Sequence, residues 1–131
     1  MTVYLQESPD ETCRIPQADV NDTSLITLLE YDCIMKIAIG KNNYFEADIC
    51  PLEMLNAYRE WYDSIEIGQM KDFEYITEDD GNNPVLYFKH SEEGWTIHSC
   101  WEKYLETKKF TLEEILSFFE MYKKELNKFI I

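Results

Sequence analysis

Two neighbouring stretches of the chain alternate between apolar and polar residues with the two-residue period of a half-buried strand. They are residues 33–39, CIMKIAI, and residues 44–50, YFEADIC. The GKNN segment between them has the composition of a tight turn. The pattern predicts an antiparallel strand pair.

A helical spacing follows at once. Pro51 suits the first position of a helix, where no backbone N–H is needed. Apolar residues then recur every three or four positions, which lines one helical face; they are Leu52, Leu55, Tyr58, Tyr62 and Ile65. The pattern predicts an amphipathic helix that ends before Gly68.

The C-terminal segment predicts a second helix. Thr111 and Glu114 have the spacing of a capping box, in which each side chain satisfies a free backbone N–H of the first turn. An apolar stripe follows at helical spacing, made of Leu112, Ile115, Phe119, Tyr122, Leu126 and Phe129. We expect this helix to lie on a sheet, with Glu120 and Lys124 forming an i,i+4 pair on its surface.

Three short apolar segments lie between these helices, at residues 71–78, 84–90 and 95–102, separated by the turn sequences EDDGNN and SEEG. Consecutive strands joined by tight turns favour a meander. Residues 25–31, LITLLEY, fit a short helix or a strand equally, and residues 1–22 read as an irregular lead-in. The sequence therefore predicts a single α+β domain over residues 1–131. Its order is β-β-α-β-β-β-α, with one mainly antiparallel five-stranded sheet and two amphipathic helices packed on one face.

The stretch GWTIHSCWE, residues 94–102, places Trp95, Ile97 and Trp101 on one face of its expected strand, together with Ser99. His98 and Cys100 share the other face. We expect the tryptophan face to pack under the helices. Trp101→Ala should then lower the stability by ~3–5 kcal/mol, as large-to-small core substitutions do.

Charge is the strongest compositional feature. The chain of 131 residues has a formal net charge of −14. Residues 103–131 contain six Lys and five Glu, so residues 1–102 hold 21 acidic and six basic side chains, a net charge of −15. Such a surface repels nucleic acid and anionic lipid, and it speeds the encounter with basic partners.

The expected compartment is the cytoplasm. The N-terminal MTVYLQESPDE lacks the basic and apolar regions of a signal peptide, and no apolar run is long enough for a membrane span. The four cysteines, Cys13, Cys33, Cys50 and Cys100, match no zinc spacing and are read as reduced thiols.

No sequence motif specifies a reaction. His98 and Cys100 could form a nucleophilic pair, but such a pair needs a hydrogen-bonded base and a third orienting group. His90 and His98, the two histidines, leave a tetrahedral metal site short of ligands. We therefore expect no catalytic residue, no metal and no cofactor. A small enzyme using His98 and Cys100, and a homo-oligomeric structural domain, remain as alternatives.

Two longer segments carry a resemblance: IAIGKNNYFEADICPLEMLNAYREWY and NPVLYFKHSEEGWTIHSCWE. Their pattern resembles a family of small uncharacterised bacterial proteins with a W-x-I-x-S-x-W strand. In size and acidity the chain also looks like the immunity proteins of contact-dependent growth-inhibition and other polymorphic toxin systems. The resemblance covers about half of the chain, and its motifs match core positions rather than site residues.

The resemblance and the charge together imply a cytoplasmic binding protein, a monomer or weak homodimer, that neutralises a basic toxin domain such as a nuclease by direct contact. The candidate partner-binding residues are those of the two acidic turns: Glu78, Asp79, Asp80, Glu92 and Glu93. Loops are favoured because a rigid scaffold presents them to a partner.

Overall fold

The computed structural model describes residues 1–78 and 83–131. In these residues it has six strands: β1 (Thr2–Gln6), β2 (Cys33–Ile39), β3 (Asn42–Ile49), β4 (Phe73–Tyr75), β5 (Leu86–Ser91) and β6 (Gly94–His98). The same residues form four helices: α1 (Gln17–Val20), α2 (Leu25–Leu28), α3 (Pro51–Glu66) and α4 (Leu112–Asn127). No helix in this described part of the chain is long and apolar enough to cross a membrane.

The strands form two antiparallel sheets, β1-β2-β3 and β4-β5-β6, so the prediction of one five-stranded sheet is wrong. The α+β class, the β2–β3 hairpin and the β4-β5-β6 meander are confirmed. Helix α3 separates β3 from β4 in the chain, and alternation within a strand carries no information about which strand lies beside it. The local pattern therefore predicted β2 to β6 correctly, but not their division between two sheets.

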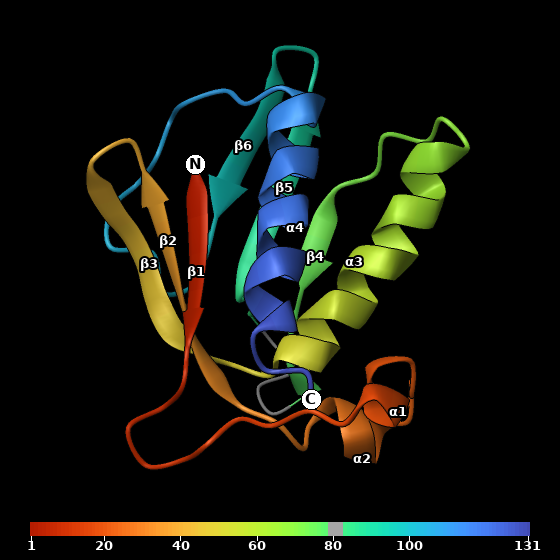
Figure 1. Cartoon of the computed structure of the whole chain (residues 1–131). Coiled ribbons are helices and arrows are strands. Elements are labelled where there is room, and N and C mark those ends of the chain that lie inside the picture. The colour runs from red at the N-terminus through yellow and green to blue at the C-terminus, as the bar shows by residue number, and fades with distance from the viewer. Residues whose placement is uncertain (79–82) are drawn as a thin grey trace.

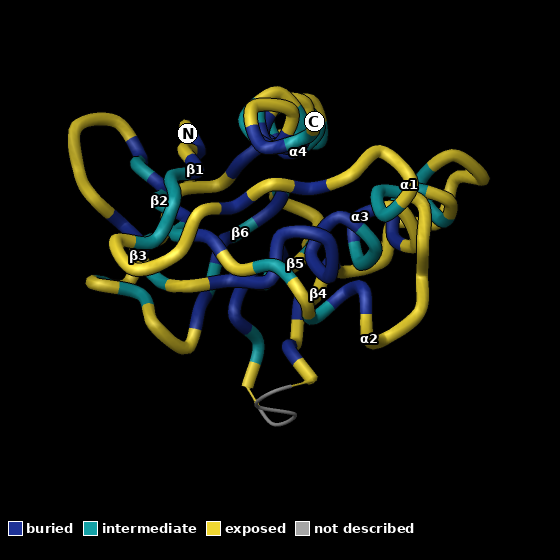
Figure 2. Tube along the Cα trace, turned by 60° about the horizontal axis from the view of Figure 1, so that its bottom comes forward, coloured by how far each residue is buried: buried dark blue, intermediate teal, exposed yellow. Residues whose placement is uncertain are grey.

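Helix α4 connects the two sheets. It contacts β1 of the first sheet and β6 of the second, while α3 contacts β4. Figure 1 shows α4 crossing in front of the strands, with α3 at the side of the β4-β5-β6 sheet. In Figure 2 the buried residues of α4 face the strands and its exposed residues face away. The core thus lies between the sheets and these two helices.

Strand β1 lies inside the segment that the sequence predicted to be irregular. It pairs with β2, and its other edge faces α4. There the N–H of Leu5 donates to Glu125 Oε1 at 3.1 Å and the N–H of Val3 donates to Met121 Sδ at 3.3 Å. A helix thereby covers an edge that would otherwise expose unpaired backbone groups.

The ambiguous segment at residues 25–31 begins with a short helix, α2, rather than a strand. Asp22 accepts hydrogen bonds from the backbone N–H of Ser24 at 2.9 Å and from the hydroxyl of Thr27 at 2.9 Å. These bonds lower the pKa of the Asp22 carboxyl. They fix the turn that leads into α2, which packs against α3.

The predicted start of α4 is confirmed. The N–H of Glu114 donates to Thr111 Oγ1 at 3.1 Å, and the N–H of Thr111 donates to Glu114 Oε1 at 3.1 Å, which completes the capping box. On the surface of the helix, Glu120 pairs with Lys123 at 2.8 Å. The ion pair recorded for Glu120 therefore spans three residues and not the expected four.

An aromatic cluster fills the space between α3, α4 and the second sheet. Phe119 of α4 stacks on Tyr58 of α3, with ring centroids 4.3 Å apart, and meets Phe73 of β4 at 4.9 Å. The sequence placed Tyr58 and Phe119 correctly on inner faces. Trp61 and Phe118 are also buried, although neither was included in the predicted stripes.

The prediction that this segment buries one face is confirmed for Trp95 and Ile97, which are 2% and 0% exposed. It is wrong for Trp101, which is 45% exposed. The strand ends at His98, and Ser99 starts a turn in which its Oγ accepts the N–H of Trp101 at 3.0 Å. Alternation stops where the strand stops. The expected core penalty for Trp101→Ala therefore does not apply.

Candidate functional site

An acidic groove lies between α2, α3 and β4. Its volume is about 330 Å³, and Leu25, Leu28, Glu53, Asn56, Ala57, Glu60, Glu74, Tyr75, Ile76 and Glu78 line it. Four of these residues are glutamates, and no Lys, Arg or His is among the described residues of the lining. The groove therefore offers negative charge around an apolar surface.

Glu53 forms the buried base of the groove. It is 7% exposed, and its two oxygens accept from the hydroxyl of Tyr75 at 2.8 Å and from the N–H of Glu78 at 3.0 Å. Burial and the nearby charge of Glu53 raise the pKa of the Tyr75 phenol, because both disfavour the charged phenolate. This network joins the first turn of α3 to the chain that leaves β4.

The other lining residues include both charged and apolar side chains that are exposed. Glu60 on α3 and Glu74 on β4 are exposed, so their carboxylates are available to a partner. Leu25 and Ile76 line the groove with exposed side chains, and neighbouring Ile26 on α2 is 84% exposed. Apolar side chains exposed beside charged ones are a feature of protein interaction sites.

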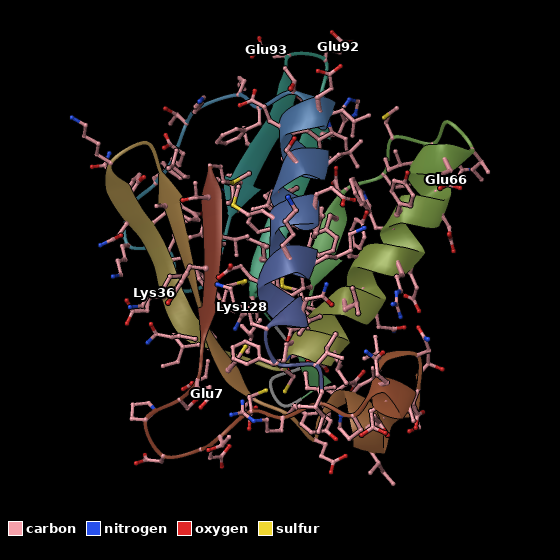
Figure 3. The ribbon with its side chains drawn as sticks, viewed as in Figure 1. Glu7, Lys36, Glu66, Glu92, Glu93 and Lys128 are labelled. Atoms are coloured by element: carbon pink, nitrogen blue, oxygen red, sulfur yellow. The ribbon has the colours of Figure 1, made fainter. Side chains whose placement is uncertain are left out.

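The predicted partner-binding residues lie at two separate places. Glu78 follows β4 and lines the groove, whereas Asp79 and Asp80 lie outside the described residues. Glu92 and Glu93 form the turn after β5, beyond the Ser91–Gly94 pair, at the opposite end of that strand. Figure 3 shows both glutamates at the top of the view, at the turn between β5 and β6. Glu93 Oε2 lies 3.8 Å from Lys109 Nζ.

The other glutamates of the groove were not predicted. Glu53 is an acidic residue in the first turn of a helix, a common place for one because it complements the helix dipole. Its sequence position gives no sign of burial. Glu60 and Glu74 belong to elements that are adjacent only after folding, so no local pattern relates them.

His98 and Cys100 lie at the end of β6 and in the turn that follows. Nε2 of His98 is 3.0 Å from Thr96 Oγ1, so this ring nitrogen is engaged within its own strand. The Cys100 thiol is exposed, and its backbone N–H donates to the carbonyl of Pro84 at 3.0 Å. The two residues therefore do not continue one strand face, because the strand ends at His98.

The two histidines lie on adjacent strands, as expected, but on different faces. His98 is opposite Tyr87 and His90 is opposite Trp95 in the β5–β6 register. Positions 87 and 90 of one strand point to opposite sides of the sheet. Within residues 1–78 and 83–131, no group of three or more His, Cys, Asp or Glu residues is placed to hold a metal ion.

Thiol modification can distinguish an ordinary exposed cysteine from a catalytic one. Cys13, Cys33 and Cys50 are buried, and desolvation raises the pKa of Cys13 to about 11. We expect Cys100 alone to react with a disulfide reagent in the folded protein, because the reagent must reach the thiol and the other three cysteines are buried. Cys100→Ser provides the control. A rate about 100-fold above glutathione would instead favour the enzyme alternative.

The chain was compared with known proteins. A family model described as a domain of unknown function, DUF7878, matches residues 8–131. The chain belongs to this family. Comparison with curated proteins and with solved structures gave no match. The DUF7878 match extends over α1–α4 and β2–β6 and begins after β1, so it includes every residue of the acidic groove.

Proposed function

We propose that this DUF7878 protein is an immunity protein that neutralises a basic toxin domain, such as a nuclease, by binding it through the acidic groove. The observation that carries the proposal is the lining of the groove, where Glu60, Glu74 and Glu78 are exposed beside exposed apolar side chains. The net charge of −14 supports the same kind of partner. The enzyme alternative would use His98, at the end of β6, and Cys100, in the turn that follows.

Electrostatics explains why the partner should be basic. A nuclease active site is positive because its substrate is a polyanion. An acidic inhibitor is therefore complementary to the positive surface that the nuclease needs in order to bind nucleic acid. The long-range attraction raises the association rate and falls as salt screens it. Exposed Leu25, Ile26 and Ile76 would then supply the apolar contact on which affinity depends.

The biological test is protection of growing cells. We expect the gene immediately upstream to encode a secreted protein with a toxic C-terminal domain. Co-expression of the chain with that domain should restore growth, and the two proteins should elute as one complex in gel filtration. Lack of protection, or of a complex, would remove the proposal.

A charge-reversal pair locates the binding surface. Glu60→Lys with Glu74→Lys should slow association with the toxin domain by about tenfold or more at low salt, and the deficit should shrink as salt rises. Both side chains are exposed, so folding should be nearly unchanged. Stopped-flow fluorescence at two ionic strengths measures the effect.

Glu92→Lys with Glu93→Lys is the matched control, because it changes the net charge equally at the opposite end of β5. We expect a deficit of less than about threefold, arising from the change in overall charge. If this pair slows association more than the groove pair does, the interface lies at the β5–β6 turn.

A further inference from the structure

A second hollow adjoins the acidic groove and shares Tyr75 with it. Its volume is about 160 Å³, and its lining consists of Asp32, Asp48, Ile49, Cys50, Tyr75, Thr77, Val85 and Trp101. Most of its exposed surface is apolar, and Trp101 is the largest side chain of its lining. We call it the Trp101 hollow.

Trp101 differs from the other two tryptophans. Trp61 and Trp95 are buried in the aromatic core, where their rings meet edge to face at 5.8 Å. Trp101 is 45% exposed, so part of its indole does not contribute the stabilisation that a buried aromatic ring gives. Exposed tryptophans in a hollow are the side chains most often found at the energetic centre of an interface.

The chain around Trp101 is firmly held. Glu102 Oε1 accepts from the N–H of Ser99 at 3.1 Å and from the hydroxyl of buried Tyr44 at 2.9 Å. The next residue, Lys103, donates its N–H to the carbonyl of Tyr44 at 2.9 Å. A partner that contacts Trp101 therefore meets a turn that is already ordered, and little conformational entropy is lost on binding.

Two carboxylates complete the rim of the hollow. Asp32 precedes β2 and Asp48 lies on β3, both exposed. Asp32 Oδ1 is 3.5 Å from Cys50 Sγ and Asp48 Oδ1 is 3.3 Å from Ser8 Oγ, and no basic side chain of the described residues forms an ion pair with either. An adjoining depression at the same two aspartates adds Asp10 and Glu11. An apolar hollow with this rim is complementary to a cation.

We propose that the Trp101 hollow receives the guanidinium group of an arginine side chain from the partner; this inference rests on the proposed function. A guanidinium is planar and weakly hydrated, stacks on an indole face and bonds carboxylates through a fork of N–H donors. A cavity of about 150 Å³ holds a benzene ring, so a planar group of similar size fits here. A lysine ammonium matches the charge but not the flat apolar surface.

The hollow can be tested without the partner. The probe is N-acetyl-arginine amide, followed through the indole N–H signal of Trp101 in proton–nitrogen NMR spectra and assigned with Trp101→Phe. We expect a saturable shift that is at least several-fold weaker with the lysine analogue. Asp32→Asn with Asp48→Asn should weaken binding by about tenfold, since the amide oxygens still accept hydrogen bonds but the negative charges that strengthen them are lost. Glu92→Gln with Glu93→Gln, the matched control, should leave it unchanged.

Two outcomes would overturn the inference: no saturable shift of the Trp101 signal, or an equal shift in the Asp32 and Asp48 double variant. Failure of the proposed function is a separate result. If the chain protects cells and Trp101→Ala protects equally, the groove binds the partner and the hollow does not. If the chain gives no protection, the immunity proposal fails, and the arginine titration still decides whether the hollow binds a guanidinium.

Discussion

Phe119→Ala is expected to lower the free energy of unfolding by about 3–5 kcal/mol, the range for removing a large aromatic side chain from a packed core. Phe119 is 0% exposed. Its ring meets five others, at centroid distances from 4.3 to 5.7 Å: those of Tyr58, Trp61, Phe73, Phe88 and Phe118. The substitution therefore removes contacts among α3, α4 and the second sheet together.

Urea denaturation followed by circular dichroism measures this loss. Trp101→Ala is the control, since it removes a larger aromatic from an exposed position. We expect it to cost less than about 1 kcal/mol, as surface substitutions do. Because a domain of this size is stable by roughly 5–15 kcal/mol, the two variants should be clearly separated. Equal losses would mean that the aromatic cluster does not dominate the core.

The sequence predicted those elements whose signals are local. The capping box of Thr111 and Glu114 requires only residues three apart, and the alternation of β2 needs only its own seven residues. Strand β1 was missed because its five residues precede a Pro-containing acidic stretch and derive their stability from β2 and α4, which are distant in sequence. The same dependence on distant partners hid the division into two sheets.

Trp101 shows how a local hydrogen bond ends a regular pattern. The alternation Trp95, Ile97, Ser99 and Trp101 continues in the sequence, but the hydroxyl of Ser99 accepts the N–H of Trp101 and turns the chain. Serine side chains compete with strand ladders in this way. Trp95, buried in a strand, and Trp101, exposed in a turn, therefore follow the same alternating pattern in the sequence.

Of the candidate site, the sequence predicted the acidic character and one lining residue, Glu78. The groove depends on α2, α3 and β4 meeting, and Leu25 and Ile76 resemble ordinary core residues until the fold leaves them exposed. Acidic turns stand out in a sequence because their charges are consecutive. Carboxylates gathered from separate elements do not stand out.

The second large effect is expected at the base of the groove. Glu53→Leu should lower the free energy of unfolding by about 2–4 kcal/mol. The Glu78 N–H loses its acceptor, and a donor left unsatisfied costs ~1–3 kcal/mol. The Tyr75 hydroxyl exchanges its bond of 2.8 Å for the longer contact with the Cys50 carbonyl at 3.4 Å, which adds to the loss. Glu60→Leu, on the exposed side of the same helix, is the control and should change stability by less than about 0.5 kcal/mol.

A double-mutant cycle isolates the Glu53–Tyr75 contact. Tyr75→Phe removes the hydroxyl that donates to Glu53 at 2.8 Å and also accepts from the N–H of Cys50 at 3.2 Å. Removing both partners of a buried hydrogen bond costs less than the sum of the single losses, since neither the hydroxyl nor the carboxylate is left without the other. We expect Glu53→Leu with Tyr75→Phe to be more stable than additivity predicts by about 1 kcal/mol or more. Strict additivity would mean that the two side chains do not act as a pair.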